Sequence, residues 1–89
     1  MTMNLQVNQI VQNVRGDIGY IASFNGIPAL VVYERYTSQP SHFNENLDHK
    51  NPNYSIVKVW DGSTLEKPSA IYRKKFDLST LPIIWEKTK

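Results

Sequence analysis

The chain lacks cysteine and long apolar runs, and these absences exclude whole classes of protein. Without any cysteine among its 89 residues, it forms neither a disulfide framework nor a thiolate metal site. No apolar stretch approaches the roughly 20 residues that a membrane-spanning helix needs. The first residues also lack the basic start and apolar centre of a signal peptide. We therefore expect a cytoplasmic protein with no membrane partner.

Glycine is scarce, and no residue pattern organises catalysis. The four glycines are isolated, which excludes a glycine-rich loop that cradles phosphates. Serine, histidine and aspartate occur, but no Gly-x-Ser-x-Gly elbow orders them. Lys74 is a candidate acid–base group because it falls among inward-facing residues of a predicted strand. The simpler interpretation packs its stem on aromatic rings and leaves the ammonium in water. We predict that the protein is not an enzyme and uses no cofactor.

The net charge of +2 is too small to indicate a polyanionic partner by itself, but the charge is unevenly placed. Residues 54–89 carry seven Lys and Arg against four Asp and Glu, whereas residues 1–36 are balanced.

The stretch from residue 18 to residue 33 predicts a β-hairpin that turns at Asn25-Gly26. Two apolar and aromatic runs flank this dipeptide, and a type I′ turn needs positive φ at both central residues. A two-residue loop fixes the register. The predicted cross-strand pairs are Phe24–Ile27, Ser23–Pro28, Ala22–Ala29, Ile21–Leu30, Tyr20–Val31, Gly19–Val32 and Ile18–Tyr33.

Both faces of this hairpin are largely apolar, whereas a solvated hairpin alternates apolar and polar residues. We expect the rest of the chain to cover one face, and a curled sheet or a second chain to cover the other. The second face is thus a predicted homodimer or partner interface. Tyr33, Arg35 and Tyr36 are its predicted anchors, because tyrosine and arginine are favoured at interfaces. Completion of a small core by these rings is the alternative.

Residues 4–15 match the period of an amphipathic helix. The apolar positions recur as i, i+4, i+7, i+8 and i+11, namely Met3, Val7, Ile10, Val11 and Val14. The adjacent pair of isoleucine and valine breaks the alternation expected of a strand, and Gly16 suits the position after a helix end. We predict an N-terminal helix that packs its apolar stripe on the sheet.

The remainder predicts a polar loop and three strands. The loop spans residues 37–53, and the strands span residues 54–60, 70–76 and 83–87. Between the last two strands, a short capped turn is expected. Together with the hairpin, these elements predict a single α+β domain over residues 1–89. Its helix packs on a five-stranded antiparallel sheet, which is either open or curled into a small SH3-like barrel.

The polar loop carries the candidate binding residues His42, Phe43 and His49. Carboxylates stand between the histidines, but a transition-metal site needs three or four ligands at fixed spacing, so we expect no metal. A solvated polar loop is the simpler interpretation of the histidines. Loops of this length in small domains are usually functional or disordered, which makes this one a candidate binding surface.

A second candidate surface is the predicted strand 70–76, where Arg73 and Lys75 follow Tyr72. With Trp60 on a neighbouring strand, these residues could stack bases and neutralise phosphates. Alternation along a strand, however, sends both cations to the face opposite the rings. Exposed cations also keep edge strands soluble, which is the alternative reading of the cluster.

We predict a non-enzymatic adaptor or inhibitory module. It presents a sheet face and the loop 37–53 to a partner protein, a small ligand or a second copy of itself. The alternative is a nucleic-acid-binding domain that uses the basic and aromatic residues 72–76.

Overall fold

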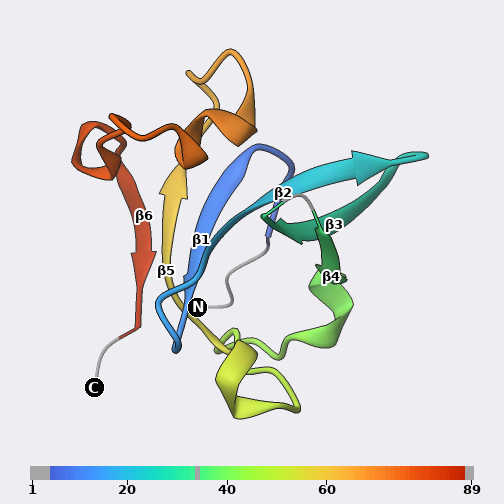
Figure 1. The fold of residues 1–89 in the computed structure, drawn as a ribbon. Helices are drawn as coiled ribbons and strands as arrows, with labels where there is room; N and C mark the ends of the chain where they lie inside the picture. Colours follow the sequence, from blue (N-terminus) through green and yellow to red (C-terminus); the bar gives the residue numbers. More distant parts are fainter. Residues whose placement is uncertain (1–4, 34, 88–89) are drawn as a thin grey trace.

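The computed structural model describes residues 5–33 and 35–87 and shows an all-β fold. Six strands form one antiparallel sheet in the order β4-β3-β2-β1-β5-β6 (Figure 1). They are β1 (Gln9–Asn13), β2 (Ile18–Phe24), β3 (Ile27–Val32), β4 (Arg35–Ser38), β5 (Ile56–Asp61) and β6 (Ile83–Glu86). Short 3-10 helices lie between them: η1 (Pro40–His42), η2 (Pro52–Tyr54), η3 (Pro68–Tyr72) and η4 (Leu78–Thr80).

The order of the strands in the sheet places β1 at the junction of two halves. Strands β1 to β4 form a meander of neighbouring antiparallel pairs. The chain then returns, so that β5 pairs with the other edge of β1, and β6 pairs with β5. Within the described residues, β1 is the strand that joins the half made by β2, β3 and β4 to the half made by β5 and β6 (Figure 1).

The prediction of an N-terminal helix over residues 4–15 is wrong, and the α+β class and the five-stranded sheet are wrong with it. Residues 9–13 form β1, which is paired along both edges. Ile10 lies opposite Tyr20 of β2 on one side and opposite Trp60 of β5 on the other. No α-helix occurs in residues 5–33 or 35–87.

Adjacent apolar residues in β1 explain this error. Ile10 belongs to the core on one face of the sheet and Val11 to the core on the other. A strand covered on both faces needs apolar residues at consecutive positions, and such a pair mimics a helical pattern. Val7 and Val14, which a helical stripe would bury, are 41% and 57% exposed. Met3, the first residue of the predicted stripe, lies outside the described residues.

The predicted hairpin is confirmed in both its turn and its register. Asn25 and Gly26 adopt φ of 53° and 81°, as a type I′ turn requires. Strands β2 and β3 pair from Phe24–Ile27 at the tip to Gly19–Val32 at the base, in the predicted order. The seventh predicted pair, Ile18–Tyr33, is not part of this ladder, because β3 ends at Val32 and Tyr33 leaves the extended conformation.

Each face of the sheet is covered by an irregular segment of the same chain. On one face, sheet residues pack against Leu47 from the segment 39–55. On the other face, they pack against Leu81 and Phe76 from the segment 62–82. Neither a closed barrel nor a second chain is needed to cover the base of the hairpin, because the chain itself supplies both covers.

The tip of the hairpin is the part that these covers leave exposed. It projects beyond the rest of the sheet (Figure 1), and Phe24 and Ile27 are 51% and 53% exposed there. The ring of Tyr36 lies edge-on to Phe24, at 6.4 Å between ring centroids. The predicted homodimer or partner interface stays a prediction, and Phe24, Ile27 and Tyr36 are the exposed apolar side chains at this tip.

The predicted strand over residues 70–76 is also wrong, because its backbone donors are used locally. The N–H of Arg73 donates to the carbonyl of Ala70, and the N–H of Phe76 donates to the carbonyl of Arg73, both at 3.0 Å. Donors satisfied three residues back are not free for a strand ladder. The strands predicted at residues 54–60 and 83–87 are confirmed as β5 and β6, with boundaries shifted by one or two residues.

Alanine substitutions of one isoleucine, Ile10, and one valine, Val14, distinguish strand β1 from the predicted helix. We expect Ile10→Ala to destabilise the protein by about 2–5 kcal/mol, because the side chain is fully buried. Val14→Ala should change the stability by less than about 0.5 kcal/mol, since this residue is exposed. A helix would place both residues on one buried stripe. Similar losses in urea denaturation would therefore contradict β1.

Two aspartates close tight turns before Ser63 and Ser79. Asp61 accepts a 2.9 Å hydrogen bond from the N–H of Ser63, and Asp77 accepts bonds of 2.9 Å and 2.7 Å from the N–H and hydroxyl of Ser79. The Asp77 contacts confirm the capped turn predicted before the last strand. The N–H and the hydroxyl of Ser63 lower the pKa of Asp61 below its ordinary 3.8, and the hydroxyl and N–H of Ser79 do the same for Asp77.

These turns make the stability depend on pH in the acid range. Because the pKa of Asp77 is lower in the folded chain than in the unfolded chain, its carboxylate stabilises the fold above the ordinary pKa. This contribution is lost as the pH falls through the lowered value. We expect Asp77→Asn, whose amide oxygen keeps the turn, to flatten the acid limb of stability measured by urea denaturation. An acid limb as steep as that of the wild type would contradict this account.

Candidate ligand-binding pocket

A pocket of about 510 Å³ opens where β3 leads into β4. Its volume lies within the range of small-molecule sites. The β1–β2 turn, the end of β3, β4 and the end of η2 supply its walls. The lining residues are Asn13, Arg15, Asp17, Leu30, Val32, Tyr33, Arg35, Thr37, Ser38 and Tyr54.

The floor of this pocket is apolar. Leu30 and Val32 are two residues apart in β3, so their side chains point to the same face of the sheet. Leu30 is buried in the core on that face, and Val32 packs against the same core. Tyr33 and Tyr54 add aromatic walls that are 61% and 43% exposed. An apolar or aromatic group can therefore rest on side chains that the fold already holds in place.

Among the described residues, two cations and one carboxylate line the rim of the pocket. Arg15 comes from the β1–β2 turn and Arg35 from β4. Within residues 5–33 and 35–87, neither arginine forms an ion pair. Asp17 also lines the pocket, but it is tied into the turn. Its N–H donates to Oδ1 of Asn13 at 3.0 Å, and the amide of Asn13 contacts its carboxylate at 3.4 Å.

The Tyr33 wall is held in an unusual backbone conformation by Tyr72. Tyr33 has a φ of 50°, a left-handed conformation that costs a bulky residue about 1–3 kcal/mol. Its N–H donates to the hydroxyl of Tyr72 at 2.9 Å, and this hydroxyl donates to the carbonyl of Ile18 at 2.8 Å. The two rings are in contact, with 4.9 Å between their centroids and an angle of 32° between their planes. Tyr72 thus ties η3 to the ends of β2 and β3.

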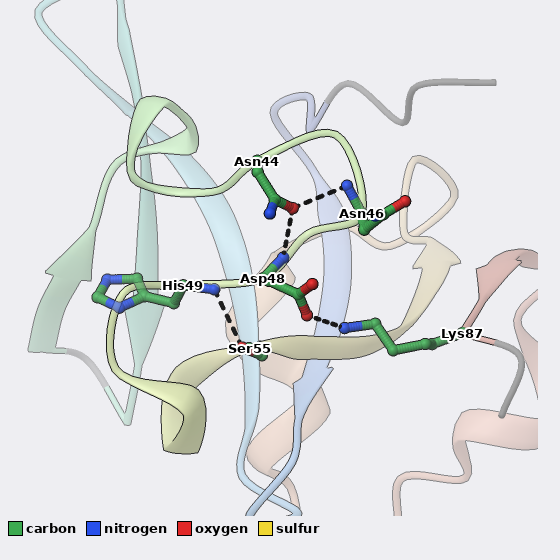
Figure 2. A network of polar contacts seen from close by, with 6 residues as sticks. All are labelled: Asn44, Asn46, Asp48, His49, Ser55 and Lys87. Atoms are coloured by element: carbon green, nitrogen blue, oxygen red, sulfur yellow. Dashed lines mark hydrogen bonds and ion pairs between the residues drawn. The ribbon is translucent and has the colours of Figure 1, made fainter.

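Tyr54, which forms the other aromatic wall, comes after the loop that contains residues 44–49. A polar network connects this loop to Ser55, just before β5, and to Lys87, just after β6 (Figure 2). The side-chain oxygen of Asn44 accepts hydrogen bonds from the N–H groups of Asn46 and Asp48, at 2.8 Å and 3.0 Å. The carboxylate of Asp48 forms an ion pair with Lys87. The N–H of His49 donates to the hydroxyl of Ser55 at 3.0 Å. The predicted polar loop 37–53 therefore has defined local contacts, and its first two residues belong to β4.

The structure brings some of the predicted binding residues to pockets. Tyr33 and Arg35 line the pocket described above. His42 and His49 line a second pocket on the other side of Thr37. Tyr36 lies at the hairpin tip, outside both pockets.

The other predicted binding residues do not gather at one surface. Phe43 packs against the core, Trp60 is buried in the opposite core, and Tyr72 clamps the sheet. Arg73 and Lys75 are exposed on the turn after η3, together with the Lys74 that was expected to point inward.

Sequence reasoning missed Arg15, Asp17 and Tyr54 because it assigned them to a helix end and to a strand. A signal was present in the sequence Arg15-Gly16-Asp17, whose glycine between polar residues is typical of a turn. Gly16 has a φ of 90°. Had residues 9–13 been assigned to a strand, this tripeptide would have been a hairpin turn beside the base of the predicted hairpin.

Within the described ranges, no cluster of three or more His, Cys, Asp or Glu residues could hold a metal ion. The same part of the chain contains no helix of the length and apolar character that crossing a bilayer requires. In comparisons with known proteins, no family model, curated protein or solved structure matches the chain. The chemistry of the pockets is therefore the basis for inferring a function.

Removal of the Tyr72 hydroxyl tests whether its hydrogen bonds to Tyr33 and Ile18 hold the Tyr33 wall of the pocket in place. We expect Tyr72→Phe to destabilise the protein by about 0.5–1.5 kcal/mol, because the bonds to Tyr33 and Ile18 are lost. Tyr36→Phe is the matched control, since it removes a hydroxyl from an exposed ring. Equal stabilities of the two variants in urea denaturation would show that the clamp does not act as described.

Proposed function

We propose that the protein is a non-enzymatic binding module whose pocket between the β1–β2 turn and β4 takes a small organic anion. The ligand class is a carboxylate carried on a flat apolar body. The observation that supports this proposal is the placement of Arg15 and Arg35, both without an ion-pair partner in the described residues, above a floor of Leu30 and Val32.

Each part of the ligand has a matching part of the pocket. A guanidinium presents a planar fork of donors that fits a carboxylate with two parallel hydrogen bonds. Burial of apolar ligand surface on Leu30 and Val32 adds to the binding affinity but does not fix the orientation of the ligand. Tyr33 and Tyr54 offer ring faces to a flat group. Among the described lining residues, the carboxylate of Asp17 opposes the anion and limits its affinity.

The nucleic-acid alternative has less support. It needs a row of rings beside Arg73 and Lys75, with their faces free to stack on bases. Tyr72 contacts Tyr33 and bonds to the sheet, and Phe76 packs against the core. The exposed cations of this turn thus lack neighbouring rings that are free to stack. Self-association, a partner protein and a cytoplasmic location stay predictions.

A pair of isosteric probes tests the charge preference. Benzoate and benzamide have the same shape, but only benzoate carries a negative charge. We expect benzoate to shift the backbone amide NMR signals of Leu30, Val32 and Thr37, and to bind at least about tenfold more tightly than benzamide. Equal binding of the two probes, or shifts confined to other parts of the chain, would refute the proposal.

Single charge removals identify the residues that bind the carboxylate. Arg35→Gln and Arg15→Gln should each weaken benzoate binding by about tenfold, whereas Asp17→Asn should strengthen it. Arg73→Gln is the matched control, because it removes the same charge from the turn after η3. If Arg73→Gln weakens binding as much as Arg35→Gln, the attraction is a general effect of net charge and the pocket assignment is wrong.

A further inference from the structure

A second pocket, of about 480 Å³, lies on the segment that covers one face of the sheet. It is lined by Thr37, Ser41, His42, His49 and Lys50. None of these side chains is a carboxylate, and Lys50 has no ion-pair partner in the described part of the chain. Whether the histidines present protons or lone pairs to this pocket decides what it can bind.

Backbone contacts fix the proton position on His42. The N–H of Gln39 donates to Nδ1 of this ring at 3.1 Å. A nitrogen that accepts a hydrogen bond carries no proton, so the neutral ring must carry its proton on Nε2. This contact lies at the start of η1, where the N–H of His42 in turn donates to the backbone carbonyl of Gln39 at 2.9 Å.

The same arrangement recurs at His49. The N–H of Asn51 donates to Nδ1 at 3.0 Å, and Nε2 lies 3.3 Å from the hydroxyl of Ser38, which is buried. The neutral ring therefore carries its proton on Nε2 and donates it toward Ser38. Edge-on contacts with His42, Phe43 and Tyr54, at 5.2 to 6.1 Å between ring centroids, hold the imidazole in place.

We infer that this second pocket binds a phosphate group, either as inorganic phosphate or as part of a phosphomonoester. Its lining residues include His42, whose neutral ring carries its proton on Nε2, together with Ser41 and Lys50. The donors of these three side chains match the acceptor oxygens of phosphate. A divalent transition metal would instead need imidazole lone pairs, and the backbone N–H groups of Gln39 and Asn51 already occupy those of both Nδ1 atoms.

The first test reads the proton positions without any ligand. Long-range proton–nitrogen correlation spectra distinguish the two ring nitrogens of a neutral imidazole by the proton that one of them carries. We expect both His42 and His49 to carry the proton on Nε2. A proton on Nδ1 of His42 would remove the donor from the pocket and overturn the inference.

The second test titrates the protein with inorganic phosphate against sodium chloride of equal ionic strength. Phosphate should shift the signals of Ser41, His42 and Lys50 along a saturating curve, and chloride should not. Glycerol 3-phosphate distinguishes the sources of the group. Tighter binding than inorganic phosphate indicates a phosphomonoester ligand, and equal or weaker binding indicates the free ion. Equal responses to phosphate and chloride would overturn the inference.

Variants of two exposed lysines complete the test. Lys50→Gln should weaken phosphate binding by at least about fivefold, while Lys67→Gln, which removes the same charge outside the pocket, should not change it. Equal effects of the two variants would contradict the site. The benzoate pocket contributes no cation to this one, so either site can fail while the other stands.

Discussion

The structure depends on the pairing of β1 along both of its edges. Ile10 lies opposite Tyr20 on one side and Trp60 on the other, and within the described residues this strand joins the two halves of the sheet. The same strand supplies both cores, since Ile10 packs on one face and Val11 on the other. Its end also carries the turn that brings Arg15 and Asp17 to the larger pocket. Loss of β1 from its central position would therefore divide the sheet into two halves, remove a residue from each core and displace the turn that lines the larger pocket.

The two covering segments replace the helices that cover the sheet in many small domains. A small domain buries a limited share of its surface, so irregular covers must be held by specific polar contacts. On one side these contacts run from Asn44 and Asp48 to Lys87, and from His49 to Ser55 (Figure 2). Both proposed ligand pockets take lining residues from this side. The polar segment 37–55 therefore shapes both candidate sites.

Local signals in the sequence predict the parts of the fold that local physics determines. Asn25-Gly26 admits positive φ at both positions, and this was enough to predict the turn and the register of β2 and β3. The adjacent Ile10 and Val11 were ambiguous, because burial on both faces depends on segments far away in sequence. Pro68 and the local bonds after it prevented a strand at residues 70–76, although apolar and basic residues alternate there. Of the larger pocket, only Tyr33 and Arg35 were predicted, since its other walls depend on the placement of β1.

The central position of β1 is tested most directly by nuclear Overhauser effects from Ile10. The account predicts cross-strand effects from Ile10 to both Tyr20 and Trp60, with slow hydrogen exchange of the β1 amides. Effects from Ile10 to Val14, which are typical of a helix, together with no contact to Trp60, would contradict it.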